Sequence, residues 1–317
     1  MKRSSLLLTL LLCLLCLPAG AQKITFMPQW TPQAQFAGYY VALEMGYYQE
    51  EGLDVEISHV KANARINPTS HLKNGEVDII TMPLLQAMVL YDGGTEVVNI
   101  LQTSQHSGLC CLSHESVSNI RDLAGKSVGR WSSGYSEAAI MAFDHYDVLV
   151  NMIPTLSGID LFIANALDAV LCYSYNELIK YRLATGCTPE EENLFQFSDV
   201  DYDFPEDGLY TTREYYETHK EALEKFVRAS KRGWDYARKR PEKALDICMD
   251  YVRQANVSTN RIHQKMMLEE ILRLQQDGEE ERSSYARISE DHFNRILEAV
   301  LEAGLVMDSI DYNAIIK

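Results

Sequence analysis

Short apolar runs alternate with amphipathic stretches along most of the chain before residue 200. Residues 23–30 alternate like a strand, and residues 33–44 place aromatic side chains at helical spacing on one face. The same rhythm continues with strand-like runs at 54–60, 77–81 and 96–102. Strands that alternate with helices in this way predict a parallel sheet covered by helices.

A second α/β series begins near residue 109. Its predicted strands are separated by short helical stretches and lie at residues 109–112, 127–131, 151–156, 169–173 and 194–197. From residue 210 the pattern becomes helical to the end, and Pro241 opens one helix at a favourable first-turn position. We therefore predict a second α/β lobe followed by a helical segment.

The N-terminus has the features of a secretory signal peptide. Lys2 and Arg3 precede an apolar run over residues 6–17, and small residues before Gln22 provide a cleavage site. The run is too short to span a bilayer. A lipoprotein signal at Cys16 is disfavoured because Leu15 precedes it. We expect residues 1–21 to be removed and the mature protein to be periplasmic.

Composition and charge exclude some classes of protein. The chain has 317 residues, is 46% hydrophobic, and carries a formal net charge of −16. This acidic balance argues against nucleic-acid binding, which requires a basic surface. The hydrophobic content is sufficient for a sizeable core.

Cysteines, histidines and carboxylates give little indication of a metal or cofactor. Five scattered cysteines follow the signal segment, and their spacing does not match a zinc site or a disulfide framework. The sequence allows one disulfide among these five cysteines but does not assign its partners. An acidic stretch over residues 199–207 lacks calcium-loop spacing and is interpreted as a solvated hinge loop. We expect no cofactor and no metal.

Several motifs resemble the substrate-binding proteins of ABC importers of the thiamine-precursor and alkanesulfonate type. They are the aromatic loop at 29–42 with its continuation at 46–55, the turn at 73–78, the segment at 119–129, and the strand start at 168–170. The resemblance covers roughly residues 23–240. It implies a two-lobe periplasmic binding protein of type II, in which each lobe is a mostly parallel sheet covered by helices and two crossovers form a hinge.

The resemblance also implies domain limits and partners. We expect lobe 1 to comprise residues 22–108 and 204–317, and lobe 2 to comprise residues 109–203. The implied function is capture of a small-molecule ligand by hinge closure and delivery to an ABC permease with its ATPase. We expect a monomer that does not bind nucleic acid.

Candidate ligand residues in lobe 1 follow the strand ends, where ligands gather in open α/β sheets. Trp30 is suited to stack on a flat ring, although a core role is the alternative. Gln33 is an amide suited to a wet site. Of Tyr39 and Tyr40, one is expected in the core and the other near the cleft, and Tyr39 is taken as the candidate.

A further strand end in lobe 1 provides Met82 and, one turn later, Gln86. Their position at a strand end favours a place in the pocket, whereas the apolar side chain of Met82 favours packing in the core. Both are taken as candidates.

The first candidate loop of lobe 2 is Ser132-Ser133-Gly134. It lies between a strand and a helix, where hydroxyls and free backbone N–H groups can bind an anion or a carbonyl. An ordinary helix cap is the alternative.

The second candidate segment of lobe 2 holds Tyr173, Tyr175, Asn176 and Glu177. A tyrosine there can provide the opposite stacking face, and Glu177 can accept hydrogen bonds from an amino group. Stabilisation of a helix first turn is the alternative for Glu177.

The expected ligand is a small planar heterocycle, most simply a thiamine pyrimidine precursor. Riboflavin and sulfonate or nitrate anions are the alternatives, and the anions are disfavoured because the candidate loops hold few basic residues. The resemblance extends to the fungal pyrimidine synthases, which use a lysine and a histidine at the positions that match Met82 and Gln86 here. We therefore expect a receptor and not an enzyme.

Overall fold

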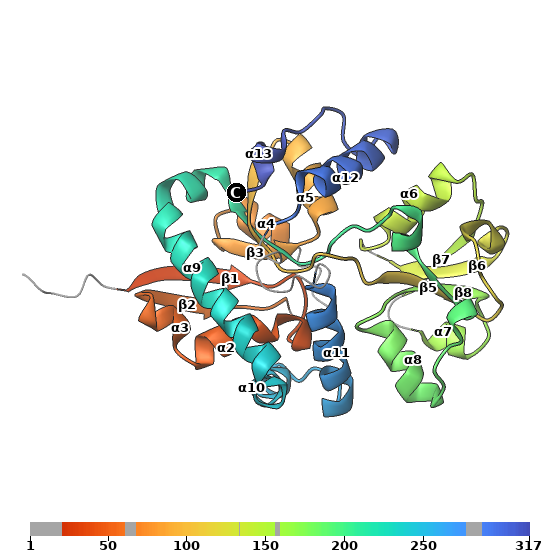
Figure 1. The fold of residues 1–317 in the computed structure, drawn as a ribbon, viewed down its shortest axis with the longest axis horizontal. Coiled ribbons are helices and arrows are strands. Elements are labelled where there is room, and N and C mark those ends of the chain that lie inside the picture. Colours follow the sequence, from red (N-terminus) through yellow and green to blue (C-terminus); the bar gives the residue numbers. More distant parts are fainter. Residues whose placement is uncertain (1–20, 61–67, 133, 156–158, 277–286) are drawn as a thin grey trace, which may run out of the picture.

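The computed structural model describes residues 21–60, 68–132, 134–155, 159–276 and 287–317. Figure 1 shows two lobes, each built on its own sheet, with two chain segments passing between them. The predicted two-lobe α/β architecture is confirmed, but both sheets are mixed and not mostly parallel as predicted, because antiparallel strand pairs are as frequent as parallel ones. The predicted signal peptide lies, apart from Ala21, outside the described residues. Over those residues, no helix has the length and apolarity needed to cross a membrane.

The sheet of lobe 1 has the order β2-β1-β3-β10-β4. Its strands are β1 (Gln22–Met27), β2 (Leu53–Ile57), β3 (Ile79–Met82), β4 (Val97–Gln102) and β10 (Gly208–Thr212). β1 pairs in parallel with β2 and β3, whereas β10 runs antiparallel to both β3 and β4. β10, which follows the other strands of this sheet by about a hundred residues, therefore lies in the interior of the sheet, between β3 and β4.

The sheet of lobe 2 has the order β7-β6-β8-β5-β9. Its strands are β5 (Leu109–Ser113), β6 (Ser127–Trp131), β7 (Asn151–Thr155), β8 (Ala169–Tyr173) and β9 (Leu194–Gln196). β5 runs antiparallel to its neighbours β8 and β9. β5 and β8 are buried along their whole length, which explains why their sequences are apolar runs without alternation.

Helices cover both sheets. Those within the two α/β series are η1 (Ala34–Phe36), α2 (Ala37–Glu44), α3 (Tyr47–Glu50), α4 (Pro68–Lys73), α5 (Leu84–Asp92), η2 (Ile120–Leu123), α6 (Glu137–His145), α7 (Asp160–Ile163), α8 (Glu177–Thr185), η3 (Glu191–Asn193) and η4 (Phe197–Val200). Those of the C-terminal segment are α9 (Arg213–Lys239), α10 (Pro241–Gln254), α11 (Arg261–Leu274), α12 (Glu290–Glu302) and α13 (Tyr312–Ile315).

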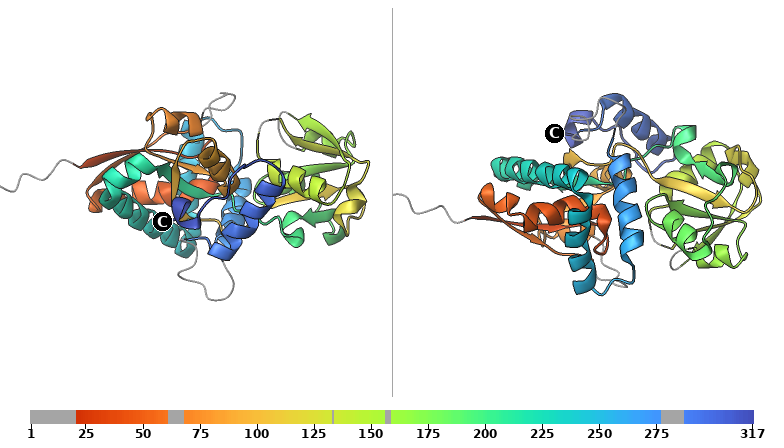
Figure 2. Two further views of the ribbon diagram at one scale, coloured as in Figure 1. Left: turned by 90° about the horizontal axis from the view of Figure 1, so that it is seen from above. Right: turned by 60° about the horizontal axis from the view of Figure 1, so that its bottom comes forward.

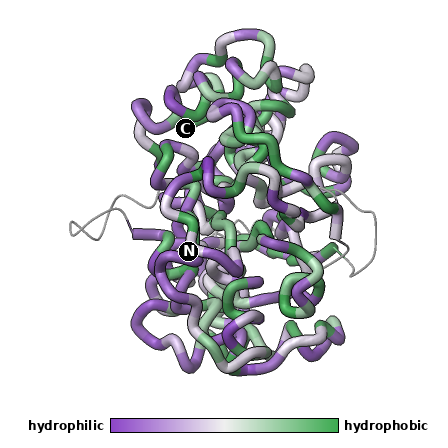
Figure 3. The backbone as a smooth tube through the Cα atoms, turned by 90° about the vertical axis from the view of Figure 1, so that its right-hand side faces the viewer, coloured by the Kyte–Doolittle hydropathy of each residue, from purple (hydrophilic) through white to green (hydrophobic). Residues whose placement is uncertain are grey.

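The C-terminal helices return to lobe 1. α9 and α10 pack on α2, α12 packs on α5, and α11 lies against η1 while also reaching α8 of lobe 2 (Figure 2). In the hydropathy-coloured trace, hydrophilic stretches lie mostly along the outline of the molecule (Figure 3).

Two glycines allow α2 and α9 to approach closely. A Cβ atom on Gly233 would lie 2.0 Å from the carbonyl oxygen of Gly38, and one on Gly38 would lie 2.2 Å from the ring of Trp234. Only residues without a side chain fit this crossing, so α9 is fixed tightly against the aromatic face of α2.

The lobes are joined by a first crossover (residues 103–108) and a second crossover (residues 201–207). The two crossovers are bonded to each other. The backbone N–H of Thr103 donates to the carbonyl of Asp207 over 3.0 Å, and the backbone N–H of Gly108 donates to the Glu206 carboxyl over 3.2 Å.

Candidate functional site

A cavity of about 30 Å³ lies where the two lobes meet the crossovers. Lobe 1 provides the start of α5, lobe 2 provides β5, β8 and the start of α6, and both crossovers contribute. The lining residues are Pro83, Leu85, Gln86, Ser107, Leu109, Tyr135, Glu137, Ala138, Tyr173, Phe204 and Glu206. This cavity is much smaller than the several hundred Å³ common for small-molecule pockets.

Lobe 2 contributes an aromatic wall. The ring of Tyr173 stacks on Trp131 at 5.0 Å and on Tyr175 at 5.1 Å between centroids. The Tyr173 hydroxyl donates to the Tyr135 carbonyl over 3.3 Å, and Tyr135 lies in the left-handed region with φ of 65°. The predicted candidates Tyr173 and Tyr175 thus belong to one stack, and Tyr173 lines the cavity.

Lobe 1 contributes Trp30 across the cleft. This side chain is 43% exposed, and its ring meets the ring of Tyr135 edge to face at 5.7 Å. The core role considered for Trp30 does not agree with this exposure. Trp30 therefore lies at the mouth of the cleft, beside the aromatic wall.

A neutral histidine holds the Trp30 loop. Burial lowers the pKa of His59 to about 4, so the ring is neutral at physiological pH. Nδ1 of His59 lies 2.9 Å from the Trp30 carbonyl and Nε2 lies 2.9 Å from the hydroxyl of Tyr40. These partners require Nδ1–H to donate and Nε2 to accept.

Tyr39 and Tyr40 are both buried. Tyr39 meets Phe26 and Trp234 edge to face, and Tyr40 stacks on Tyr251 at 4.2 Å. Tyr39 is 1% exposed and is absent from the described cavity lining. This placement does not support the prediction that Tyr39 contacts a ligand.

The amides of the Trp30 loop bind inside the protein. Gln29 Nε2 and Gln35 Nε2 each donate to Asp207 Oδ1 over 2.9 Å, and Gln33 Nε2 donates to Gln35 Oε1 over 2.5 Å. All three glutamines are buried. The candidate Gln33 therefore stabilises the loop through its bond to Gln35, and the described cavity lining does not include Gln33.

The two candidates near α5 have different surroundings. Met82 is 1% exposed within β3, whereas Gln86 lines the cavity. Gln86 also faces lobe 2, because a Cβ atom on Gly134 would lie 3.7 Å from its Nε2. The strand end thus provides packing at Met82 and a polar group to the cleft at Gln86.

The loop after β6 reaches the cleft at Gly134, which has φ of 65°. Ser132 is exposed and is not among the residues of the described cavity lining. The candidate Ser133 lies outside the described residues.

Asn176 and Glu177 are bonded locally. Glu177 is buried, and its carboxylate accepts from the Tyr173 backbone N–H over 3.1 Å and from Asn176 Nδ2 over 2.7 Å. Glu177 is also the first residue of α8. These bonds agree with the helix first-turn interpretation and link Glu177 to the position of Tyr173.

The second crossover holds carboxyl groups that the sequence interpretation placed in solvent. That interpretation is wrong for Glu206 and Asp207, which are 2% and 4% exposed, and correct for Asp199 and Asp201, which are exposed. Asp203 is half-buried. Donors from the first crossover make this burial possible.

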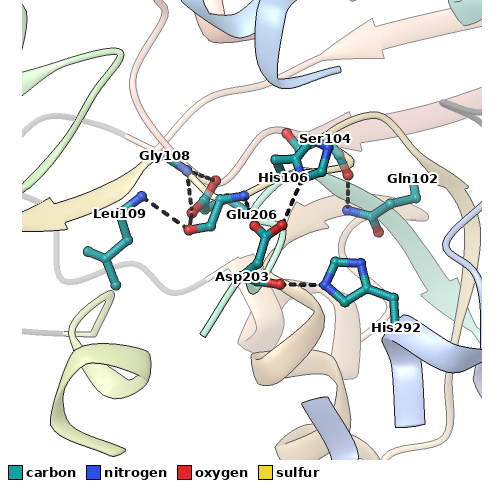
Figure 4. Close-up of polar contacts among 9 residues, drawn as sticks. Gln102, Ser104, His106, Gly108, Leu109, Asp203, Glu206 and His292 are labelled. Atoms are coloured by element: carbon teal, nitrogen blue, oxygen red, sulfur yellow. Dashed lines mark hydrogen bonds and ion pairs between the residues drawn. The ribbon is translucent and has the colours of Figure 1, made fainter. Parts of the chain in front are cut away.

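Glu206 forms the polar end of the cavity (Figure 4). Its carboxyl accepts from the Ser107 hydroxyl and from the Gly108 backbone N–H. Burial raises the pKa of Glu206 well above its ordinary value, with the neighbouring Asp207 adding to the shift. The folded protein therefore binds the proton of Glu206 more tightly than a solvated glutamate does.

Asp207 lies behind Glu206 and beneath the Trp30 loop. Burial raises the pKa of Asp207 to about 7, against the hydrogen bonds from Gln35, Gln29 and Ser104 that favour the carboxylate. It connects the loop of lobe 1 to the second crossover.

A second cavity of about 260 Å³ lies on the outer side of the crossovers and is lined by polar residues. In its lining, Asp203 lies 2.7 Å from His106 Nδ1 and also accepts from the Ser107 backbone N–H, while His292 of α12 donates to the Asp203 carbonyl (Figure 4). The first two contacts join the crossovers to each other, and the His292 bond attaches them to α12.

Comparison with known proteins gives a family match and relatives of known ligand. A family model described as NMT1/THI5 like matches residues 33–244. The riboflavin-binding protein RibY of Chloroflexus aurantiacus is 23% identical over 259 residues, which cover 79% of this chain and 72% of that protein. The formylaminopyrimidine-binding protein of Halalkalibacterium halodurans is 24% identical over 248 residues, which cover 74% of this chain and 72% of that protein.

The solved structures of similar fold include the periplasmic aliphatic sulphonate binding protein SsuA of Escherichia coli. The TM-score is 0.65 with 11% identity, and the match covers 92% of this chain and 96% of that chain. This likeness establishes the periplasmic-binding-protein fold alone.

Proposed function

Because the chain belongs to the NMT1/THI5-like family, we propose that it is the substrate-binding protein of an ABC importer, which captures a thiamine pyrimidine precursor between its lobes. The main supporting observation is the cavity itself, in which a buried carboxyl on Glu206 faces the aromatic wall of Tyr135 and Tyr173. A flat ring fits between aromatic faces, and its polar edge can meet the carboxyl.

The raised pKa of Glu206 favours the neutral carboxylic acid, and this form suits an aminopyrimidine. A neutral carboxylic acid offers one O–H donor and one acceptor oxygen. An aminopyrimidine edge offers the reverse pair, an amino donor beside a ring-nitrogen acceptor. The two groups can therefore form paired hydrogen bonds without burying a net charge.

Cavity chemistry disfavours a sulfonate or nitrate ligand. The described lining residues include the carboxyl groups of Glu137 and Glu206 and no lysine or arginine. Arg130 donates to the carbonyl of Trp131. A strongly anionic ligand would meet like charge or a neutral acid without a cation to compensate it.

Riboflavin is the second candidate ligand, since a relative is named for it. Its three-ring system requires a wider opening than one pyrimidine ring does, and the cavity of about 30 Å³ is too small to hold either ligand. Either ligand would enter a more open cleft and favour the closed state by binding it better.

Glu206 lies on the second crossover, so a ligand bonded to it contacts the hinge directly. We propose that this contact couples occupancy to closure, and that the closed protein is presented to an ABC permease and its ATPase. Export to the periplasm and a monomeric state are part of the same proposal.

Binding without turnover is the proposed activity. The fungal synthases require a lysine that the chain replaces by the buried Met82. An incubation with the aminopyrimidine ligand should return it chemically unchanged by mass spectrometry. Conversion of the ligand, or a bound pyridoxal chromophore, would overturn the receptor proposal.

Calorimetric titration with formylaminopyrimidine, riboflavin and taurine tests the ligand. We expect formylaminopyrimidine to bind most tightly, and Glu206→Ala to weaken it roughly 10- to 100-fold, because the paired hydrogen bonds with the carboxyl group are lost. Glu206→Gln is the matched control, since an amide also offers an N–H donor beside an acceptor oxygen, and should change the affinity less than about threefold. Binding of taurine alone, or unchanged affinity in Glu206→Ala, would contradict the proposal.

A further inference from the structure

Two cysteines of lobe 2 lie side by side on neighbouring strands. Cys110 of β5 and Cys172 of β8 are direct partners in the antiparallel register. Their Sγ atoms are 3.3 Å apart, and the Cys110 thiol also donates to the Cys172 carbonyl over 3.3 Å. The residues are far apart in the sequence and meet only because the sheet places β5 beside β8.

The strand geometry is compatible with a covalent bond. Directly opposed residues on antiparallel strands have Cα atoms about 4.5 to 5.5 Å apart, and disulfides commonly span Cα distances of about 4.4 to 6.8 Å. Rotation of the two side chains is therefore sufficient to bring the sulfur atoms into bonding distance.

The alternation of the strand distinguishes Cys110 from its neighbour Cys111. Successive side chains of a strand point to opposite faces of the sheet. Cys110 and Cys172 belong to one small core cluster with Phe162 and Leu178, whereas Cys111 belongs to the large core on the other face. Cys111 therefore cannot replace Cys110 in a bond to Cys172 without a change of register.

The remaining described cysteines lie elsewhere. Cys248 is buried in α10 of lobe 1, and Cys187 is exposed after α8. Each is a single thiol without the register relation that joins Cys110 to Cys172.

We propose that Cys110 and Cys172 form a cross-strand disulfide when the protein folds in an oxidising compartment. A protein or small-molecule disulfide is the oxidant. One cysteine thiolate attacks it, which forms a mixed disulfide and releases one oxidant sulfur as a thiolate. The second cysteine thiolate then attacks the cysteine sulfur of the mixed disulfide and displaces the other oxidant sulfur. The oxidant has then taken up two electrons and two protons and is present as two thiol groups. Export to such a compartment belongs to the proposed function, but the chemistry can be tested without it.

The bond forms during folding, before β5 and β8 are covered. The hydrogen bond with Cys110 and burial raise the pKa of the Cys172 thiol, and both residues are 0% exposed. Since the thiolate is the attacking species, the folded pair is inert and the folding chain is the reactive species.

This disulfide would stabilise one wall of the cleft. β8 ends at Tyr173 and β5 begins at Leu109, and both of these residues line the cavity. The link joins positions 62 residues apart in the sequence, and closure of a long loop restricts the unfolded chain. We expect the oxidised protein to melt about 5 to 10 °C above the reduced protein.

Refolding in glutathione disulfide or in a phosphine reductant tests the proposal. The full chain carries Cys13→Ser, Cys16→Ser and Cys187→Ser, which remove the thiols of the N-terminal segment and the exposed Cys187. After refolding, the oxidant or reductant is removed. The protein is then unfolded in guanidinium chloride near neutral pH with excess N-ethylmaleimide, and its alkylated thiols are counted by intact mass. The oxidised sample should have two fewer alkylated thiols, and peptide mapping should link the segment of Cys110 to that of Cys172.

Single variants identify the bonded pair. Cys110→Ser should abolish the cross-link and the melting difference, whereas Cys111→Ser, the matched control on the opposite face, should retain both. If Cys110→Ser fails to fold, fragmentation of the linked peptide still distinguishes Cys110 from Cys111. Equal alkylation in both buffers, or a link from Cys111, would overturn the inference.

Discussion

The two lobes use the same kind of aromatic-rich strand end in different ways. In lobe 1, Tyr39 and Tyr40 lie in the core, and Trp30 alone of these three side chains is exposed, beside the cavity residue Tyr135. In lobe 2, Tyr173 lines the cavity and stacks with its neighbours. The position of an aromatic residue after a strand is thus insufficient to make it a ligand residue.

The difference comes from the C-terminal helices. α9 and α10 return to lobe 1 and cover α2, so Tyr39 meets Trp234 of α9 and Tyr40 meets Tyr251 of α10. Among the described residues of lobe 2, α6 and α8 have nine residues each, so neither approaches the 27 residues of α9. The two lobe 1 tyrosines therefore pack against the C-terminal helices and do not face a ligand.

Replacement of Trp234 by alanine should have the largest effect on this arrangement. Trp234 of α9 is 1% exposed and packs against Tyr39. Truncation of a buried Trp to alanine lowers the free energy of unfolding by about 3–5 kcal/mol. Urea unfolding should show a loss of that size. Trp30→Ala is the matched control and should change the free energy of unfolding by less than about 0.5 kcal/mol; a comparable loss in both variants would remove the contrast between core and cleft tryptophans.

Asp207 should give lobe 1 a pH-dependent stability. Its pKa rises from 3.8 to about 7 on folding, so the folded state binds the proton more tightly. The associated stability is fully present below pH 4 and is lost as the pH rises to about 7, a change of about 2–4 kcal/mol.

Asp207→Asn should remove this part of the pH dependence of the free energy of unfolding, measured between pH 4 and pH 7.5. The amide keeps an acceptor for Gln29 and Gln35. Part of the slope should remain, because Glu206 shifts in the same direction. Asp199→Asn, an exposed carboxylate before the second crossover, should leave the slope unchanged; an identical slope in Asp207→Asn and the native chain would refute the assignment.

Tyr40→Phe should have a smaller effect, confined to stability. The variant removes the donor to His59 Nε2 and should cost about 1 kcal/mol in the free energy of unfolding. Ligand affinity should not change, because the ring remains in the core.

Tyr173→Phe is the counterpart of Tyr40→Phe in lobe 2. It should alter ligand affinity by more than it alters stability. The opposite result for the two variants would reverse the comparison of the lobes.

The fold was predictable because it is determined by local patterns. Strand alternation, apolar runs such as β8 and the helical spacing of α2 predicted both lobes, and the family motifs predicted their order. Tyr173 and Gln86 were predictable as cavity residues for the same reason, since each lies next to a strand end.

The remaining site features depend on long-range contacts. Glu206 belongs to an acidic stretch that resembles a solvated loop, and its burial requires Ser107 and Gly108 from the first crossover. Tyr39 is buried by a helix almost two hundred positions later in the chain. Local sequence does not contain these partners, so it could not distinguish a buried carboxyl from an exposed one or a core tyrosine from a cleft tyrosine.

The interior position of β10 has a consequence for the order of folding. All strands of lobe 2 lie between Leu109 and Gln196, whereas the lobe 1 sheet needs Gly208–Thr212 between β3 and β4. During synthesis, lobe 2 can therefore complete its sheet while lobe 1 still consists of separate pieces. Until β10 arrives, β3 and β4 present open edges to other chains, so a chain truncated before residue 208 combines a folded lobe 2 with an aggregation-prone lobe 1.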